Sequence, residues 1–198
     1  MKRMASVPKH YEFGQLLFPG EHAGFLDVVK NYKKTSDTAY THELGRLNIE
    51  GLKLPTETLD RITGLVNQLL DPPQPLEMVT PPLCVIYAAE YGDPRLPPHF
   101  DGDFTDFIID YQLDSSTTWP LGADLNVYPL KDNSAVGFNP NKTIHWRPEK
   151  QFQPGEYVTM IFFRFVNSEN PSDNSHLPHH PDDEVFKEVA AFRDSYRG

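Results

Sequence analysis

The chain has 198 residues, with 18 Lys and Arg against 28 Asp and Glu, so its formal net charge is −10. This length predicts one domain large enough to bury a core. The acidic balance argues against a general binder of nucleic acid or anionic membranes, since both need basic side chains to neutralise phosphate. A single cysteine, Cys84, excludes a disulfide framework and any multi-cysteine zinc or iron–sulfur site. Residues 1–9 lack the apolar run of a signal peptide and no stretch matches a membrane span, so we expect a cytoplasmic protein.

The first third of the chain is predicted to be helical. Apolar residues recur at helical spacing over residues 20–32 and again over 55–70. Pro72 and Pro73 end the second of these helices. Residues 44–54, which lie between the two helices, are predicted to form a short strand and a turn.

From residue 79 the pattern changes to short, dense apolar runs separated by prolines and other turn residues. Proline cannot donate to a central β-ladder, so this spacing is typical of strand ends and turns. Six β runs without intervening helices indicate a sandwich, barrel or jelly roll. The six runs are 82–91, 104–114, 123–130, 134–138, 143–146 and 157–166.

The expected organisation is a single domain over residues 1–198. Residues 1–78 form a helical N-terminal support, residues 79–166 form the jelly-roll core, and residues 167–198 form a polar loop and a C-terminal helix that begins near Asp182. The predicted fold class is therefore mainly β with flanking helices.

His99 and Asp101 form an H-x-D motif after the first core strand. In an extended chain, residues i and i+2 point the same way, so an imidazole and a carboxylate face one side. A metal ion that needs mixed nitrogen and oxygen ligands can take both from this strand end. On its own the motif is weak, and a solvated turn is the alternative.

A second histidine, His145, strengthens the motif because it lies inside a β run, between Ile144 and Trp146. Two histidines and one carboxylate on one face of iron, with the opposite face open, form the facial triad of non-haem Fe(II) oxygenases. Open positions admit a cosubstrate and O2, which a closed four-ligand zinc site does not. The alternative for His145 is a core histidine whose ring N–H is satisfied by a backbone carbonyl.

Several short motifs follow one another in order between residues 82 and 166. They are Tyr91-Gly92, Pro98-His99-Phe100-Asp101, Phe107-Ile108-Ile109-Asp110-Tyr111-Gln112-Leu113, Gly122-Ala123-Asp124-Leu125, Ala135-Val136-Gly137-Phe138-Asn139-Pro140, His145-Trp146-Arg147-Pro148 and Gly155-Glu156-Tyr157-Val158-Thr159. As an ordered set they resemble the 2-oxoglutarate/Fe(II) oxygenases, in the prolyl-hydroxylase-like branch. The resemblance implies a double-stranded β-helix, which is a cupin-like jelly roll, with His99, Asp101 and His145 as iron ligands and 2-oxoglutarate as cosubstrate.

The chain departs from that family at one position. The family places an Arg or Lys on the last core strand, where it pairs with the distal carboxylate of 2-oxoglutarate, and this chain has Tyr157 there. Arg147 is the favoured substitute, because in a regular strand it faces the same interior as His145. Arg164 lies seven residues after Tyr157, on the opposite face unless a bulge intervenes.

Three hydroxyls complete the expected cosubstrate site, those of Tyr157, Thr159 and Tyr91. The alternative for Arg147 is a rim position paired with Glu149 or an Asp. Without a cation in the pocket, 2-oxoglutarate is not the expected cosubstrate, because a buried unpaired carboxylate costs several kcal/mol.

Two further groups of polar residues are interpreted as peripheral. Residues 173–183 are rich in His, Asp and Pro and are expected to form a loop with adventitious metal affinity, or alternatively a lid. Asp106 and Asp110 alternate with apolar residues in a strand and are expected at the rim, with contact to a cationic substrate as the alternative.

The resemblance thus implies a dioxygenase that uses Fe(II), O2 and 2-oxoglutarate to hydroxylate an unactivated C–H bond. Its substrate is expected to be a small molecule, amino-acid-like compound or peptidyl group, without nucleic-acid or membrane partners. The presence of Asp101 favours hydroxylation or desaturation, since halogenating relatives lack this carboxylate. Two alternatives stay open: a jelly-roll module that binds a sugar or metabolite, and a cupin-type metalloenzyme that works without 2-oxoglutarate.

Overall fold

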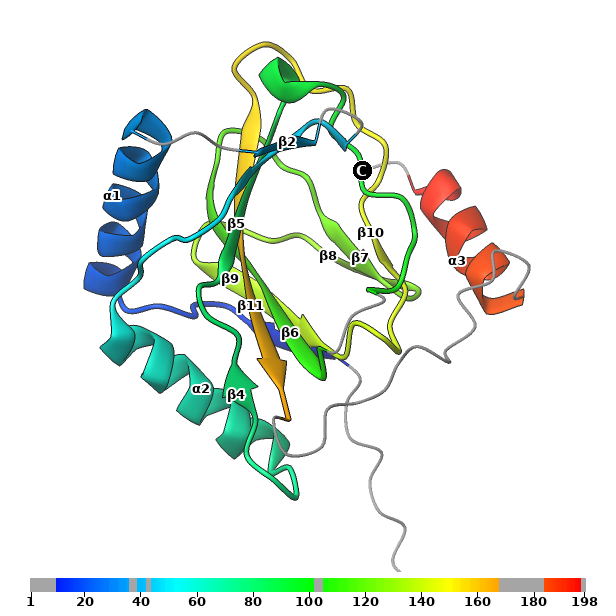
Figure 1. Cartoon of the computed structure of the whole chain (residues 1–198). Coiled ribbons are helices and arrows are strands. Elements are labelled where there is room, and N and C mark those ends of the chain that lie inside the picture. Colours follow the sequence, from blue (N-terminus) through cyan, green and yellow to red (C-terminus); the bar gives the residue numbers. More distant parts are fainter. Residues whose placement is uncertain (1–9, 36–38, 42–43, 102–104, 168–183, 197–198) are drawn as a thin grey trace, which may run out of the picture.

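The computed structural model describes residues 10–35, 39–41, 44–101, 105–167 and 184–196. This part of the chain is mainly antiparallel β with three helices (Figure 1). The helices are α1 (Pro19–Thr35), α2 (Thr56–Leu70) and α3 (Glu184–Ser195), with a 3-10 turn, η2, at Ala89–Tyr91. The strands are β1 (His10–Phe13), β2 (Ala39–Thr41), β3 (Arg46–Ile49), β4 (Glu77–Met78), β5 (Leu83–Ala88), β6 (Phe107–Ser115), β7 (Leu121–Ala123), β8 (Asn126–Tyr128), β9 (Ser134–Phe138), β10 (His145–Trp146) and β11 (Tyr157–Val166).

The strands form one large and one small antiparallel sheet. The large sheet has the order β1-β9-β6-β11-β5-β3-β2, and β4 pairs with β11 beside this path. The small sheet has the order β10-β7-β8. A buried apolar cluster with members on both sheets, including Val136 and Met160 on the large one and Leu121 on the small one, packs the two against each other.

Each face of the large sheet has a different partner, because alternate side chains of a strand point to opposite faces. In Figure 1, α1 and α2 lie together on one side of the large sheet, whereas α3 lies beyond the small sheet. Phe163 and Phe165 of β11 belong to the cluster under α1 and α2, with Phe25 and Ile62 from those helices. The opposite face of β11 points to the space between the two sheets, where the candidate site lies.

The third helix packs against the small sheet at the strand that carries His145. Trp146 of β10 is fully buried and makes edge contacts with Phe192 and Tyr196, at ring-centroid distances of 5.9 Å and 6.4 Å. Val189 completes this cluster. The C-terminal helix therefore supports β10 from outside.

The helices predicted over 20–32 and 55–70 are present as α1 and α2, and most predicted strands are present as well. The run 123–130, predicted as one strand, is instead the hairpin β7–β8. Asp124 takes a left-handed conformation (φ 50°) and reverses the chain there. The first third also contributes β1, β2 and β3 to the large sheet, besides its two helices.

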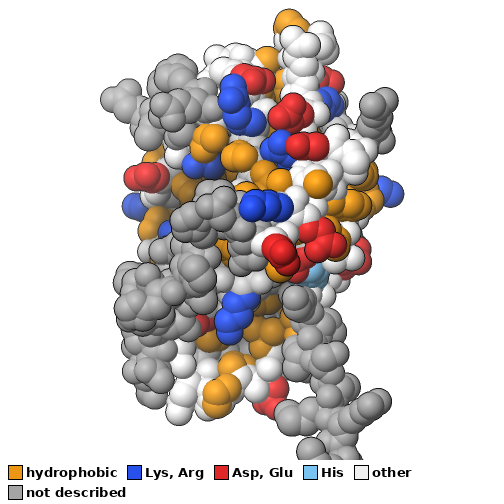
Figure 2. Space-filling view, turned by 90° about the vertical axis from the view of Figure 1, so that its right-hand side faces the viewer, with side chains coloured by type: hydrophobic (Ala, Val, Ile, Leu, Met, Phe, Trp, Pro, Cys, Tyr) orange, Lys and Arg blue, Asp and Glu red, His pale blue; other side chains and the backbone are white. Residues whose placement is uncertain are grey.

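Acidic and basic side chains are interspersed on the face of the molecule drawn in Figure 2.

Among the described residues, none of the helices combines the length and the apolar character that crossing a bilayer requires.

Candidate metal centre

The two histidines of the site are held side by side by the backbone. His99 N–H donates to the His145 carbonyl at 3.1 Å, and His145 N–H donates to the His99 carbonyl at 3.0 Å. This antiparallel bridge extends the small sheet by one residue beyond β10. The imidazole centroids are consequently 4.0 Å apart, although the residues are distant in the chain.

Asp101 completes a three-donor cluster with these histidines. One carboxylate oxygen, Oδ1, lies 3.4 Å from Nε2 of His99 and 3.4 Å from Nε2 of His145. A hydrogen bond from Asp101 N–H to the Pro140 carbonyl, 3.1 Å long, anchors the backbone. One donor atom from each residue lies within 4.8 Å of the others. Ligands at about 2.1 Å from one metal ion, at right angles, are about 3 Å apart, so this spacing suits a shared ion.

The orientation of both imidazoles fits metal binding. Nδ1 of His99 lies 2.8 Å from the Pro97 carbonyl, and Nδ1 of His145 lies 3.3 Å from the Thr143 carbonyl. A carbonyl accepts from N–H, so each bond favours the tautomer with a proton on Nδ1 and a lone pair on Nε2. Both lone pairs face the Asp101 carboxylate, and a divalent cation with mixed nitrogen and oxygen preference fits this donor set.

Electrostatics keep Asp101 ionised. Burial opposes its ionisation, but the adjacent His145 and His99 side chains outweigh burial and hold the pKa of Asp101 well below its ordinary value. Burial also opposes the charge on His145, and the neighbouring Asp101 and Asp110 carboxylates raise the pKa of His145 on balance. The ionised Asp101 carboxylate therefore favours a positive charge between the two imidazoles.

A cavity of about 490 Å³ opens beside the three donors. Its polar lining comes from His99, Asp101, His145, Asp110, Arg46, Arg164 and Tyr87, and its apolar lining from Leu83, Leu96, Phe100, Ile108 and Phe162. This volume is typical of a site for small molecules. The cluster and the cavity together place three donor atoms that could hold a metal ion beside a binding space.

Arg147, the favoured cation, is buried inside the domain but lies outside this lining. Its guanidinium stacks over Trp119 at 4.8 Å, donates to the Trp119 carbonyl, and lies 3.2 Å from Met160 Sδ. Only 2% of the residue is exposed, and burial lowers its pKa. Arg147 is therefore not at the rim and is not paired with Glu149. Its guanidinium is held by Trp119 and Met160, outside the lining of the cavity.

Arg164 lies on the opposite face of β11 from Tyr157, as the seven-residue offset predicts. The face that carries Arg164 is the one that lines the cavity of the triad. A register shift opposite Thr159 and Met160 is taken up by β6, so the alternation along β11 is kept. Tyr157, where the family's cation was aligned, therefore points away from the metal centre.

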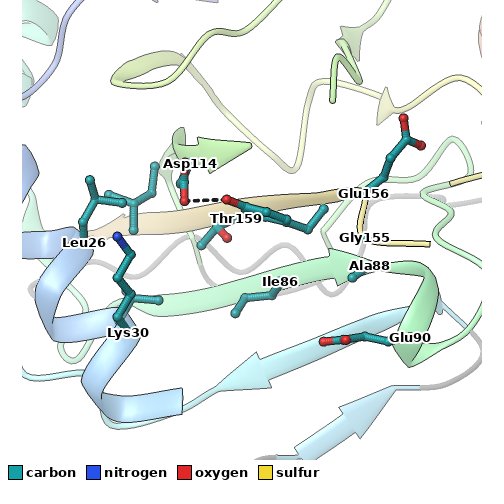
Figure 3. Close-up of a pocket in the computed structure, with 12 residues that line it drawn as sticks. Leu26, Lys30, Ile86, Ala88, Glu90, Asp114, Gly155, Glu156 and Thr159 are labelled. Atoms are coloured by element: carbon teal, nitrogen blue, oxygen red, sulfur yellow. Dashed lines mark hydrogen bonds between the residues drawn. The ribbon is translucent and has the colours of Figure 1, made fainter. Parts of the chain in front are cut away.

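The three expected hydroxyl donors lie on the helix side of the large sheet. Tyr157 and Thr159 line a separate cavity of about 270 Å³ under α1, where Tyr157 Oη donates to Asp114 at 2.9 Å. Figure 3 shows this cavity, with Thr159 and Asp114 on one side and Leu26 and Lys30 of α1 on the other. Tyr91 belongs to the apolar cluster on the same side. The structure does not bring these hydroxyls to the triad.

Sequence reasoning missed two polar residues of the cavity and misplaced a third. Asp110, expected at the rim, is 4% exposed and lines the cavity, and its Oδ1 has no hydrogen-bond partner among the described residues. Burial raises the pKa of Asp110 to about 7. Arg46 and Tyr87 face each other across β3 and β5, and Arg46 hydrogen-bonds the Tyr87 phenol. The alternation Ile108-Asp110-Gln112 was the available signal for an inward polar face.

Residues 173–183, which were interpreted as a loop with adventitious metal affinity or a lid, lie outside the described residues. Asp106, the other expected rim residue, is half-buried and accepts a hydrogen bond from the Asn167 N–H at 2.8 Å.

Comparison with known proteins shows the fold. No family model matches the chain, and no curated protein matches its sequence. Among solved structures, the epimerase SnoN in complex with Fe3+, alpha ketoglutarate and nogalamycin RO is similar with a TM-score of 0.59, 12% identity and 79% of each chain covered. A prolyl hydroxylase from Trichoplax adhaerens has a TM-score of 0.56 and 10% identity over 87% of this chain and 88% of that one. A 2OG-Fe(II) oxygenase family protein from Burkholderia pseudomallei has a TM-score of 0.57 and 11% identity over 84% and 87%.

Proposed function

We propose that the protein is a non-haem Fe(II) oxygenase that uses 2-oxoglutarate, built on a double-stranded β-helix. The observation that carries the proposal is the convergence of His99, Asp101 and His145 on one point beside a cavity. The order β9-β6-β11-β5 in the large sheet, facing β10-β7-β8, supports the jelly roll. The similar structures support the cofactor assignment, since one of them is a complex with Fe3+ and alpha ketoglutarate.

The triad residues would hold the iron, each in a stated role. His99 and His145 present Nε2 because their Nδ1 protons are held by backbone carbonyls. Asp101 supplies the negative charge that a divalent cation needs, and its low pKa keeps it ionised. When bound, Fe(II) supplies the activation of O2 that is coupled to oxidative decarboxylation of 2-oxoglutarate to succinate and that ends in oxidation of a substrate C–H bond.

Arg46 and Tyr87 are the proposed partners of the distal carboxylate of 2-oxoglutarate. Both line the cavity, and Arg46 Nε is buried without a hydrogen-bond partner among the described residues. A guanidinium and a phenol that already touch each other present several donors to one carboxylate, which is a strong, directional site. Arg147 is a less suitable partner because Trp119 and Met160 already surround its guanidinium.

The apolar lining has a separate task, which is to exclude water from the reacting centre. Leu83, Leu96, Ile108 and Phe162 surround the cavity next to the triad. A dry wall strengthens electrostatic contacts to the cosubstrate and protects reactive species from side reactions with water. The proposed reaction is hydroxylation of a small-molecule, amino-acid-like or peptidyl substrate.

Anaerobic titration tests the proposal. Addition of Fe(II) and then 2-oxoglutarate should produce a weak visible charge-transfer band, and admission of O2 should produce succinate. His145→Ala should abolish both signals, whereas His176→Ala should leave them intact. Iron binding without the band would favour a cupin-type metalloenzyme that works without 2-oxoglutarate. Failure to bind iron would refute the proposal and favour a jelly-roll binding module.

A series of Arg→Lys variants tests the cosubstrate site. Lysine keeps the charge but loses the two-pronged contact with a carboxylate. We expect Arg46→Lys to weaken 2-oxoglutarate binding by about tenfold or more, with iron affinity unchanged. Arg147→Lys is the matched comparison. If it weakens 2-oxoglutarate more than Arg46→Lys does, the cosubstrate role belongs to Arg147.

A further inference from the structure

The cavity contains a carboxylate that neither the metal centre nor 2-oxoglutarate uses. Asp110 projects from β6 into the cavity, is 4% exposed, and has a buried Oδ1 with no hydrogen-bond partner among the described residues. A buried acceptor left unsatisfied costs about 1–3 kcal/mol, so a group of this kind usually has a partner that is missing from the structure.

The metal does not need this carboxylate. The cluster of donor atoms within 4.8 Å contains His99, Asp101 and His145, and Asp110 is outside it. The cosubstrate does not satisfy it either, because 2-oxoglutarate has only acceptor oxygens and carries two negative charges. Once ionised, Asp110 needs a donor, and a donor group on the substrate is the one that this cavity can bring to it.

A cation lies one diagonal step away from Asp110 on the same face of the sheet. In the register of β6 and β11, Asp110 is opposite Phe162 and Ile108 is opposite Arg164. All four side chains line the cavity. Diagonal neighbours of this kind have Cα atoms about 7–8 Å apart. An anionic and a cationic side chain thus flank one small volume.

Arg46, the other arginine that lines the cavity, lies at a different position along the strands of the large sheet. Arg46 is opposite Tyr87, and Tyr87 is opposite Val158, six residues before Arg164 on β11. At about 3.3 Å per residue, the two backbone levels are about 20 Å apart along the strand. Two separate guanidiniums therefore reach the cavity from opposite ends, which provides one site for each of two carboxylates.

We propose that Asp110 and Arg164 form the substrate subsite, and that the substrate is a free amino acid or a close analogue, with its ammonium on Asp110 and its carboxylate on Arg164. This inference rests on the proposed function, in which Arg46 and Tyr87 take the cosubstrate. A cavity of about 490 Å³ accommodates an amino acid together with 2-oxoglutarate.

Calorimetry on the protein loaded with Mn(II) and 2-oxoglutarate tests the proposal. The probes are the standard amino acids, their desamino carboxylic acids and their decarboxylated amines. At least one amino acid should bind, and loss of either charged group from that ligand should weaken binding by about tenfold or more.

Asp110→Asn and Arg164→Gln assign the two contacts. Asp110→Asn should erase the preference for the amino acid over its desamino acid, and Arg164→Gln should erase the preference over the amine. Both variants should bind Mn(II) and 2-oxoglutarate within about threefold of wild type, which also shows that they are folded. Asp114→Asn is the matched control, because Asp114 lies on β6 but faces the cavity under α1.

The outcomes separate the two proposals. If the wild-type protein fails to bind Mn(II) or 2-oxoglutarate, the proposed function is overturned. Intact binding of both, with no amino acid bound or with the preference unchanged in Asp110→Asn, would overturn the substrate subsite alone.

Discussion

Gly122→Ala tests how strictly the packing under β10 positions His145, the proposed metal ligand. A Cβ atom on Gly122 would lie 2.1 Å from Trp146 Cε2 and 2.4 Å from Cδ2. Carbon atoms in contact rest at about 3.5–4.0 Å, so the indole would have to move by about 1.4–1.9 Å. Trp146 is fully buried, and its Nε1 donates to the Asp124 carbonyl at 3.1 Å. The ring therefore has no open space to move into.

The expected cost follows from these contacts. Overpacking of a buried ring costs about 1–3 kcal/mol, and loss of the indole hydrogen bond adds about 1 kcal/mol. The free energy of unfolding should therefore fall by about 2–4 kcal/mol. Because Trp146 directly follows His145, we also expect weaker binding of Mn(II) or Fe(II).

Urea denaturation and metal titration measure both effects. Gly64→Ala is the matched control, since a Cβ atom at this position of α2 meets no atom within 4 Å. There the same substitution should raise stability by about 0.5–1 kcal/mol, because alanine is the better helix former. If Gly122→Ala unfolds at the same urea concentration as the wild type, the reasoning about β10 is wrong.

Three further perturbations probe other parts of the fold. Cys84 is buried and its pKa is raised to about 12 by burial, so iodoacetamide should alkylate it only after unfolding in urea, and rapid labelling of the folded protein would contradict its placement. Burial raises the pKa of Asp110 from 3.8 to about 7, so between these pH values the folded metal-free protein keeps a proton that the unfolded chain has lost, and the free energy of unfolding falls as pH rises. Asp110→Asn should flatten this part of a curve of melting temperature against pH. A variant curve parallel to that of the wild type would exclude the titration of Asp110. Arg61 joins α2 to α1 through two contacts with Glu21, at 3.0 Å and 2.5 Å. Arg61→Ala should therefore lower the free energy of unfolding by about 1 kcal/mol. An unchanged urea midpoint would show that the ion pair contributes nothing to stability.

The sequence could place His99 and Asp101 together because they are close in the chain, and the metal-ligand role of the cluster stays a prediction. His99 and Asp101 are two residues apart and face one side of an extended segment, and His145 lies within an apolar run. The structure brings them together through one antiparallel bridge between His99 and His145. Periodicity also located α1 and α2, since their buried faces are continuous.

The polar lining of the cavity was harder to predict. Alternation along β6 shows that Asp110 shares a face with Ile108, but it does not show whether that face meets solvent or an internal cavity. Arg46 comes from a strand before the stretch that resembles the oxygenases, so no motif pointed to it. Arg147 follows a two-residue strand, and stacking on Trp119 turned its guanidinium away from the cavity.

X-ray absorption of the protein loaded anaerobically with Fe(II) tests the central claim most directly. We predict one iron per chain, bound by two imidazoles and one carboxylate, with further positions that exchange when 2-oxoglutarate is added while both imidazoles stay. His145→Ala should remove one imidazole shell or the iron itself. A closed four-ligand site, or an iron environment that does not change in this variant, would contradict the proposed centre.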